Sequence, residues 1–287
     1  MRKAVITGVR RPAVVPMPEL QPAGDRVVAM PPYSCGECAW CEAGDHVHCT
    51  QDATTFFAGR EGSAAMAEVL LKPERLLVPI PDGMSYAHAA MACCGLGASF
   101  GALQRLHVDA WETVLITGMA PVGLGGVINA SYRGARVIAV ESHPYRALLA
   151  AELGAEAVID AADDGGLATI PSLTGGRGVD KAIECSGAAA GQRLCIGATR
   201  IKGAVCFVGE SSAPTELEVS RHLLRKGLTL TGTWHYNLND AATLMREIAE
   251  VGRSLDRLIT HSFPLERVQE ACELQASGAC GKVVLRP

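Results

Sequence analysis

The sequence has no long hydrophobic run and no strong excess of charge of either sign. No apolar stretch approaches the roughly 18 residues of a membrane-spanning helix. The start of the chain, MRKAVITGVRR, contains an apolar stretch that is too short for a signal peptide. We therefore expect a cytoplasmic protein with no membrane partner. A net charge of −4, an isoelectric point near 6.1 and no basic block exclude general electrostatic attraction to nucleic acid.

Internal repeats and low-complexity linkers are also missing. The 287 residues are 48% apolar and 20% charged, which is typical of a globular protein with one large domain or two of ordinary size. Of the 11 cysteines, four are clustered and the others lie singly or as one adjacent pair in apolar surroundings. This distribution indicates metal ligands and core thiols, not a disulfide framework.

The cysteine cluster is the strongest metal signal and consists of Cys35, Cys38, Cys41 and Cys49. Four thiolates complete the tetrahedral shell of a structural zinc and leave no position open for water. The alternatives are chance clustering, a redox CxxC motif, or an iron–sulfur cluster, whose ferredoxin spacings differ from these. With four cysteines present, we expect His46 and His48 to be surface side chains.

The segment from Thr113 to Glu141 predicts half of a dinucleotide-binding βαβ unit. An apolar β-rich run is followed by a glycine-containing turn, a helix-like segment and a second apolar run that ends in an acid. Gly118 lets the strand turn, Gly123 lets the helix pack close to it, and the N–H groups at the helix start would face a pyrophosphate. Glu141 would accept hydrogen bonds from ribose hydroxyls and repel a 2′-phosphate, which favours NAD over NADP.

The middle glycine of the usual G-x-G-x-x-G pattern is Ala120 in this chain. Its methyl group narrows the approach of a pyrophosphate without closing it. A strand-to-helix turn of some other α/β protein is the alternative, and the acid at the right distance argues against it.

Strand-like and helix-like segments alternate through the middle of the chain. The apolar strands are Thr113–Thr117, the run that ends at Glu141, Ala157–Ile159, Lys181–Cys185, Ala204–Gly209 and Leu228–Gly232. Six such strands separated by helices predict an α/β fold, a Rossmann doubly wound parallel sheet that binds ligands at the carboxyl ends of its strands.

Further elements flank this unit. We expect strands at Arg26–Met30, Ala67–Leu71, Leu76–Ile80 and Gly281–Leu285, and an amphipathic helix from about Asn237 to Gly252. A helix begins at Ser85, and a stretch of small residues from Met91 to Leu103 is expected to be helical.

These motifs together resemble the zinc-containing medium-chain dehydrogenase/reductase family, which includes the alcohol, polyol and threonine dehydrogenases. The resemblance covers most of the chain: the GDRV strand, the four-cysteine lobe, Cys94-Gly-x-Gly, the GxxPVGL turn at 118–124, ECSG at 184–187 and the tail THSFPLERVQEA at 260–271. It implies a coenzyme domain inserted into a GroES-like β domain. We expect a reduced GroES-like domain with the zinc lobe at 1–94, a Rossmann domain at 95–235, and a returning C-terminal segment at 236–287.

The resemblance also implies roles for single residues. NAD would contact Gly118, Pro121, Val122, Gly123, Leu124, Glu141, Arg146, Cys185, Val208 and Gly209, with Val208 and Gly209 near the nicotinamide and Arg146 beside the adenosine. Cys94 takes the family position of the last catalytic zinc ligand. Family members act on small-molecule alcohol or carbonyl substrates and form homodimers or homotetramers.

The chain departs from the family at the other catalytic ligands. Leu20–Gly24 joins the first strands directly to the GDRV strand, so several tens of residues are missing, and no Gly-His-Glu occurs anywhere. A catalytic zinc needs three protein ligands and an open position, which one cysteine cannot supply. The alternative for Cys94 is a small buried thiol packed in a glycine-rich helix. In the family the missing span also supplies core strands of the GroES-like domain, so we expect that domain to be reduced or rearranged.

His235 follows the sixth strand, near the expected nicotinamide end of the cleft. His235 or Tyr236 could donate a proton in a zinc-free reduction, but no partner base is visible, so a cleft wall or an oligomer contact is the alternative. Two hypotheses follow: an NAD(H)-dependent oxidoreductase acting on a secondary alcohol or polyol and its ketone, and a dinucleotide-binding protein without turnover or independent of zinc.

Overall fold

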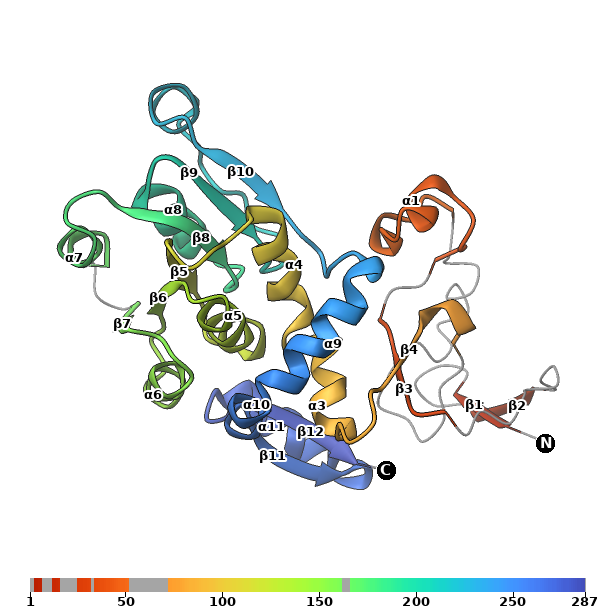
Figure 1. The fold of residues 1–287 in the computed structure, drawn as a ribbon. Helices are drawn as coiled ribbons and strands as arrows, with labels where there is room; N and C mark the ends of the chain where they lie inside the picture. Colours follow the sequence, from red (N-terminus) through yellow and green to blue (C-terminus); the bar gives the residue numbers. More distant parts are fainter. Residues whose placement is uncertain are drawn as a thin grey trace.

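The structure, a computed structural model, describes residues 3–6, 12–15, 25–31, 34–51, 72–161 and 166–286 (Figure 1). Its centre is a six-stranded sheet with the order β10-β9-β8-β5-β6-β7, in which every pairing is parallel. The strands are β5 (Thr113–Thr117), β6 (Arg136–Val140), β7 (Ala157–Ile159), β8 (Val179–Glu184), β9 (Thr199–Phe207) and β10 (Thr229–Gly232). The predicted doubly wound sheet is confirmed strand by strand.

Helices cover both faces of this sheet (Figure 1). They are α4 (Gly97–Leu106), α5 (Pro121–Tyr132), α6 (Pro144–Glu152), α7 (Gly166–Leu173) and α8 (Ala189–Ala198). Along β5, Val114 and Ile116 belong to the core shared with α4, α5 and α6, whereas Leu115 belongs to the core shared with α7 and α8. Alternate residues of a strand point to opposite faces, so a strand buried on both sides is apolar throughout.

The strand order reverses between β5 and β8, which are hydrogen-bonded neighbours although β6 and β7 separate them in the chain. In open α/β sheets the crevice at such a switch point, outside the carboxyl ends of the strands, is where ligands bind. The glycine turn leaves β5 at this edge, and the Cys185–Gly187 turn leaves β8 beside it.

The remaining strands form three separate pairs. β1 (Lys3–Ile6) is antiparallel to β2 (Pro12–Val15), β3 (Val27–Ala29) is antiparallel to β4 (Leu77–Pro79), and β11 (Ile259–Pro264) is parallel to β12 (Lys282–Arg286). The strands predicted around residues 26–30, 76–80 and 281–285 are confirmed. The strand predicted at Ala67–Leu71 lies outside the described residues.

The other helices surround these pairs: α1 (Ala39–Glu42), α3 (Tyr86–Ala89), α9 (Ala241–Glu250), α10 (Gly252–Leu258) and α11 (Val268–Ser277). A π-helical segment spans Val219–Arg225, and short 3-10 helices span His46–His48, Glu74–Leu76, Ala90–Ala92, Leu238–Asp240 and Leu265–Arg267. α9 buries Ala241, Leu244, Met245 and Ile248, the spacing of one helical face. It starts later than predicted because Asn237 begins the preceding 3-10 turn by accepting from the N–H of Asn239.

The prediction of a continuous helix from Met91 to Leu103 is wrong. Residues 93–96 leave the helix as a turn in which the Leu96 N–H donates to the Met91 carbonyl at 2.8 Å. The physical reason is the close approach of α5, because a Cβ atom on Gly125 would lie 1.9 Å from the Gly95 carbonyl oxygen. Cys94 therefore lies in a turn.

None of the described helices is, by itself, long and apolar enough to cross a membrane. One bent pair, Tyr86–Ala92 with Gly97–Leu106, passes on length and composition when the two are joined across their 44° bend.

Candidate coenzyme and metal sites

Two glycines shape the turn between β5 and α5. Gly118 has φ of 81°, and a Cβ atom there would lie 2.7 Å from Ser186 Cα, so both conformation and space require glycine. A Cβ atom on Gly123 would lie 1.9 Å from the Gly118 carbonyl oxygen. The helix thus starts in contact with the strand that precedes it.

The N-terminus of α5 has the properties of an anion site. Ala120 is the N-cap residue and supplies no side-chain cap, and Pro121 follows it. The N–H groups of Val122 and Gly123 belong to the first turn, where no intrahelical acceptor exists. Uncapped N–H groups and the helix dipole together favour a phosphate group at this position.

Glu141 follows β6 and binds the glycine turn. One carboxylate oxygen accepts from the Met119 N–H, and the other accepts from the N–H groups of Ser142 and His143, each at 2.8 Å. A carboxylate offers about four lone-pair positions, so acceptor capacity remains for ribose hydroxyls. The ribose contact stays a prediction.

The nicotinamide side of the predicted site is built from the ends of β8 and β9. The Cys185 N–H donates to Thr117 at 2.9 Å, and a Cβ atom on Gly209 would lie 2.3 Å from the Gly187 nitrogen. Desolvation raises the pKa of the half-buried Cys185 thiol well above its usual value, so this side chain is neutral. The fold therefore brings Gly118, Cys185, Val208 and Gly209 to one edge of the sheet.

Two other residues predicted to contact NAD, Arg146 and Leu124, make their contacts elsewhere in the fold. Leu124 is fully buried in the core. The guanidinium of Arg146 donates to the carbonyls of Cys280 at 3.4 Å and Gln275 at 3.3 Å, and so ties α6 to the C-terminal segment. Its predicted adenosine contact is untested.

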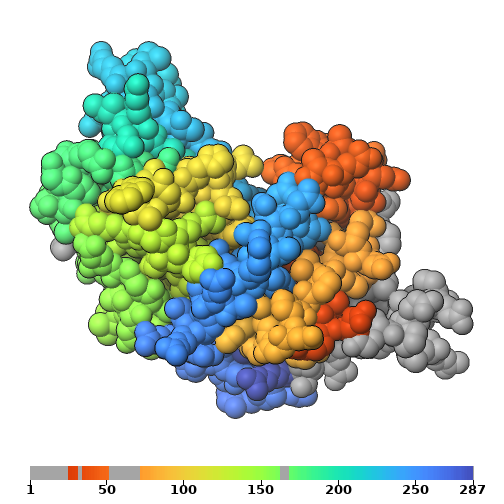
Figure 2. Space-filling view, viewed as in Figure 1, coloured from red at the N-terminus to blue at the C-terminus, as the bar shows by residue number. Residues whose placement is uncertain are grey.

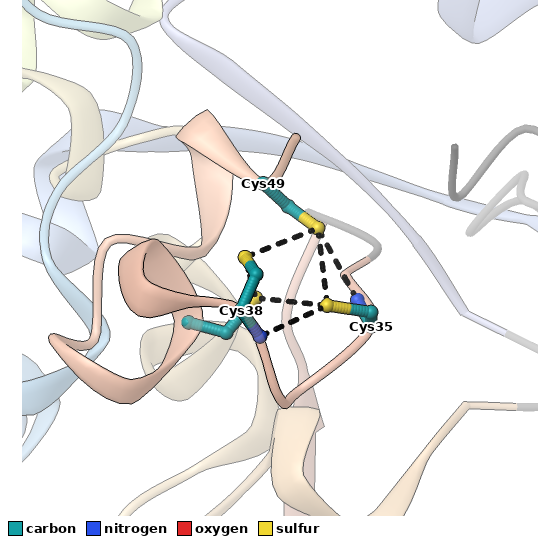
Figure 3. Close-up of side chains that lie close together, drawn as sticks. Cys35, Cys38 and Cys49 are labelled. Carbon is teal, nitrogen blue, oxygen red and sulfur yellow. Dashed lines mark hydrogen bonds between the residues drawn. The ribbon is translucent and has the colours of Figure 1, made fainter. Parts of the chain in front are cut away.

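The four cysteines of the lobe converge, and Figure 3 shows three of them, Cys35, Cys38 and Cys49, with their sulfur atoms turned toward one another. Their Sγ atoms lie within 4.8 Å of one another, and the four closest pairs are separated by 3.5, 3.6, 3.8 and 3.9 Å. A tetrahedron with zinc–sulfur bonds of 2.3 Å has edges of about 3.8 Å. The donor set therefore fits a zinc ion in a closed structural site.

Backbone groups support the same reading of the lobe. The N–H groups of Glu37 and Cys38 donate to Cys35 Sγ at 3.4 and 3.3 Å, and the Cys35 N–H donates to Cys49 Sγ at 3.3 Å. Hydrogen bonds of this kind stabilise thiolates. Burial raises the pKa of Cys41 to about 12, so a bound cation is what would ionise it.

His46 contradicts the expectation of a surface side chain. It is buried, and its Nδ1 lies 2.7 Å from Ser34 Oγ. Burial lowers its pKa, so the ring is a neutral core group of the lobe. His48 is exposed, as expected.

The lobe is attached to the segment that precedes α9. The side-chain amides of Asn237 and Asn239 donate to the Ala43 carbonyl at 2.9 and 3.1 Å, and the Leu238 N–H donates to the Gly44 carbonyl at 2.8 Å. In Figure 2 the orange-red lobe lies against the blue surface of this region. No feature of the sequence predicted these asparagines.

Cys94 is exposed, which contradicts the alternative of a buried thiol. Its neighbour Cys93 is largely buried and donates to the Ala29 carbonyl at 3.5 Å, and burial raises its pKa to about 11. Within the described ranges, the four-cysteine lobe is the one group of His, Cys, Asp or Glu side chains close enough to bind a metal. Among the described residues, Cys94 is therefore not part of a three-ligand group of the kind that a catalytic zinc needs.

His235 and Tyr236 have different environments. Tyr236 is a core residue that packs edge-on against Phe100, with its hydroxyl 3.4 Å from Met30 Sδ. His235 has φ of 64°, and in the part of the chain that the structure describes its buried Nδ1 has no hydrogen-bond partner. Burial lowers the pKa of His235, so the ring is neutral. Whether His235 donates a proton or only forms part of the cleft wall is untested.

An apolar cavity has a volume of about 710 Å³, and its lining includes no residue of the glycine turn. Residues of β3, α3 and β12 line it, and Cys93 is part of its wall. It is separate from the coenzyme edge described above.

Comparison with known proteins gives the same class as the geometry. Residues 15–82 match the alcohol dehydrogenase GroES-like domain, and residues 121–250 match the zinc-binding dehydrogenase family. The zinc-type alcohol dehydrogenase-like protein YphC of Escherichia coli (strain K12) is 35% identical over 270 residues, which are 91% of this chain and 74% of that protein. The L-threonine 3-dehydrogenase of Bacillus velezensis is 32% identical over 268 residues, 92% of this chain and 76% of that protein.

Solved structures agree on the fold. An alcohol dehydrogenase zinc-binding domain protein from Burkholderia ambifaria superposes with a TM-score of 0.80 at 29% identity, over 96% of this chain and 80% of that one. The alcohol dehydrogenase TADH from Thermus sp. ATN1 gives 0.83 at 24% identity, over 99% of both chains. The fold and the two sites define a zinc-type oxidoreductase with a Rossmann domain. The chain belongs to the zinc-containing medium-chain alcohol dehydrogenase family.

Proposed function

We propose that this chain is an NAD(H)-dependent oxidoreductase that interconverts a secondary alcohol or polyol and its ketone. The observation that carries the proposal is the uncapped glycine turn at the β5/β8 switch point, with Glu141 at the end of the neighbouring strand. When bound, NAD would supply the acceptor for the hydride that leaves the alcohol carbon, and the hydroxyl proton would pass to solvent as the ketone forms.

The residues of the chain would bind and orient the coenzyme. The first-turn N–H groups of α5 would hold the pyrophosphate, and the carboxylate of Glu141 would hold the ribose hydroxyls and disfavour a 2′-phosphate. Val208 and Gly209, after β9, would bound the nicotinamide. The half-buried thiol of Cys185, whose pKa desolvation raises, would add no charge to that side of the site.

Zinc enters this proposal in the lobe. Cys35, Cys38, Cys41 and Cys49 would hold one structural ion, which supplies folding free energy to the lobe and no chemistry. No step is assigned to a catalytic ion, because Cys94 is exposed and, within the described residues, belongs to no group of three or more side chains that could hold a metal. This observation favours a second candidate, a dinucleotide-binding protein that is non-catalytic or works independently of zinc.

We also propose a homodimer or homotetramer. Ile201 on β9 and Val219 and Leu224 on the π-helical segment are 65%, 55% and 73% exposed. They flank the edge strand β10, and a hydrogen bond of 2.8 Å from the Lys202 N–H to Lys226 joins their segments. Exposed apolar side chains beside an open sheet edge suit burial against a second copy. Light scattering on the purified chain tests this, and a monomer would contradict it.

The activity is tested by NADH production from NAD with a panel of secondary alcohols and polyols. L-Threonine belongs in the panel because it is a secondary alcohol and the named substrate of a relative. Saturable turnover above background supports the oxidoreductase and rejects the non-catalytic candidate. Tight NADH binding without turnover of any substrate in the panel supports the non-catalytic candidate.

A further inference from the structure

Glu184 ends strand β8 with a fully buried carboxylate. The parallel pairing sets it opposite Thr117 of β5 on one side and Phe207 of β9 on the other, so it lies at the switch point of the sheet. A charged residue is costly to bury unless hydrogen bonds compensate it. What surrounds this carboxylate therefore explains why it is tolerated.

The donors to the carboxylate come from the turn after β8 and from the end of β5. Oε1 accepts from the N–H of Ser186 at 2.7 Å, from the N–H of Gly187 at 3.1 Å, from the Thr117 hydroxyl at 3.3 Å and from the Ser186 hydroxyl. Oε2 lies 3.2 Å from the same Gly187 nitrogen. The turn after β8 is thus folded around this side chain.

The main chain of Glu184 fixes a second loop. Its carbonyl accepts from the N–H groups of Val208 at 2.8 Å and Gly209 at 2.9 Å, which holds the loop after β9. A Cβ atom on Gly209 would lie 2.9 Å from Glu184 Oε2. The loops after β8 and β9 therefore pack directly on this one residue.

The third loop is the glycine turn itself. A Cβ atom on Gly118 would lie 2.7 Å from Ser186 Cα and 2.8 Å from its nitrogen. Because that nitrogen donates to Glu184, the position of Ser186 against the glycine turn depends on the carboxylate. The contact leaves no room for Ser186 to shift toward Gly118.

The charge is stabilised without a cation. Among the described residues no Lys, Arg or His forms an ion pair with Glu184. The start of α8 lies close to the carboxylate instead, since a Cβ atom on Gly191 would be 3.0 Å from Oε1, and α8 has no side-chain cap. A helix N-terminus favours a negative charge. The carboxylate and the loops around it depend on each other.

We propose that Glu184 is a positioning residue that holds the three coenzyme-facing loops, after β5, β8 and β9, in their binding geometry. This inference rests on the proposed function, because it assigns those loops to NAD(H). Burying the charge costs free energy of folding, and the result is a preorganised coenzyme site, which a neutral strand end of the same shape would not give.

The test compares two isosteric changes on the same strand. Glu184→Gln keeps the shape but turns an N–H toward the donors at the carboxyl end of β8. Asp180→Asn does the same at the amino end, where the buried carboxylate accepts from the Thr113 N–H at 2.8 Å and from Arg200 at 2.6 Å. Both variants lose a buried carboxylate. The measurements are the Kd for NADH by calorimetry and the thermal midpoint of each variant.

We expect Glu184→Gln to raise the Kd for NADH tenfold or more, the ratio that corresponds to about 1.4 kcal/mol, while Asp180→Asn leaves the Kd within about twofold and lowers only the thermal midpoint. Equal effects of the two variants on Kd, or none from Glu184→Gln, overturn the inference while NADH binding by the unaltered chain still supports the proposed function. No NADH binding by the unaltered chain overturns both.

A milder variant covers the case in which Glu184→Gln does not fold. Thr117→Val is isosteric and removes one hydroxyl donor to Glu184, and Thr117 is 2% exposed. Its expected effect is a rise in the Kd for NADH of about threefold to tenfold, the range for loss of one hydrogen bond. An unchanged Kd for a folded Thr117→Val contradicts the inference.

Discussion

The Gly118 carbonyl oxygen lies so close to the backbone of Gly123 that a Cβ atom on Gly123 would be 1.9 Å from it. Gly123→Ala must therefore move α5 away from the strand. We expect the free energy of unfolding to fall by about 1–3 kcal/mol, the usual cost of overpacking. The Kd for NADH should rise at least about tenfold, as the first-turn N–H groups lose their alignment. Calorimetric titration and urea unfolding measure both.

Gly252→Ala is the matched control for that change. Gly252 also starts a helix, α10, but the nearest atom to an added Cβ would be 3.7 Å away, an ordinary contact. Both the Kd for NADH and the free energy of unfolding should stay at or near their unaltered values. If Gly123→Ala and Gly252→Ala change the Kd for NADH and the free energy of unfolding equally, NADH binding does not depend on the close approach at Gly123.

Cys38→Ser should release the zinc of the lobe. Removing one of four thiolates opens the closed shell, and metal content by mass spectrometry should fall from about one ion per chain to near none. Cys272→Ser, which changes an exposed cysteine of α11, is the control and should keep the full zinc content. Unchanged zinc in Cys38→Ser would refute the four-thiolate site.

Glu141→Ala should weaken NADH binding and relax the discrimination against NADPH. The substitution removes the charge that repels a 2′-phosphate, so the ratio of the Kd for NADPH to the Kd for NADH should fall about tenfold, or by about 1.4 kcal/mol. The carboxylate also holds the N–H groups of Met119, Ser142 and His143, so part of the weakening will be common to both coenzymes. An unaltered ratio would rule out the ribose contact.

The burial of Glu247 should make the free energy of unfolding depend on pH. It is buried in α9 near Arg133, and burial raises its pKa from 4.5 to about 7. The folded state therefore binds this proton more tightly than the unfolded state, and the stability present below pH 4.5 is lost as the pH rises to about 7. Glu247→Gln cannot ionise and avoids that loss. Its stability relative to the unaltered chain should rise by about 2–3 kcal/mol across this range.

Chemical unfolding at a series of pH values measures this difference. Glu250→Gln, on the exposed side of the same helix, controls for the change in net charge. The prediction is contradicted if the difference in free energy of unfolding between Glu247→Gln and the unaltered chain stays constant from pH 4.5 to 7.5. Ionisation of the buried carboxylate would then not destabilise the folded state.

The coenzyme half of the molecule was predictable because its signals are local. A five-residue strand with three apolar residues between two threonines, a turn that needs glycine at Gly118 and Gly123, and an acid after the next strand are all short-range signals. The strands at 113–117 and 157–159 were predicted to the residue. The metal lobe was equally accessible, since CxxC spacing is itself a geometric constraint.

Other features depend on distant contacts and were missed or mispredicted. The helix break at 93–96 results from the approach of α5, more than 25 residues on in the chain, and it is what leaves Cys94 exposed. His46 is buried and forms a hydrogen bond with Ser34, which the spacing of the cysteines did not reveal. The role of Glu184 had one sequence signal, an acid at the end of a strand, but its hydrogen-bond donors come from the turn after β8, the end of β5 and the loop after β9.

The most direct test of the account is a calorimetric titration of the purified full chain with NADH, followed by NADPH. The account predicts one saturable NADH site per chain, lost in Gly123→Ala and retained in Gly252→Ala, with NADPH bound at least about tenfold more weakly. Absence of saturable NADH binding, or tighter binding of NADPH, would contradict the central claim that the turn at Gly118–Gly123 with Glu141 is an NAD(H) site.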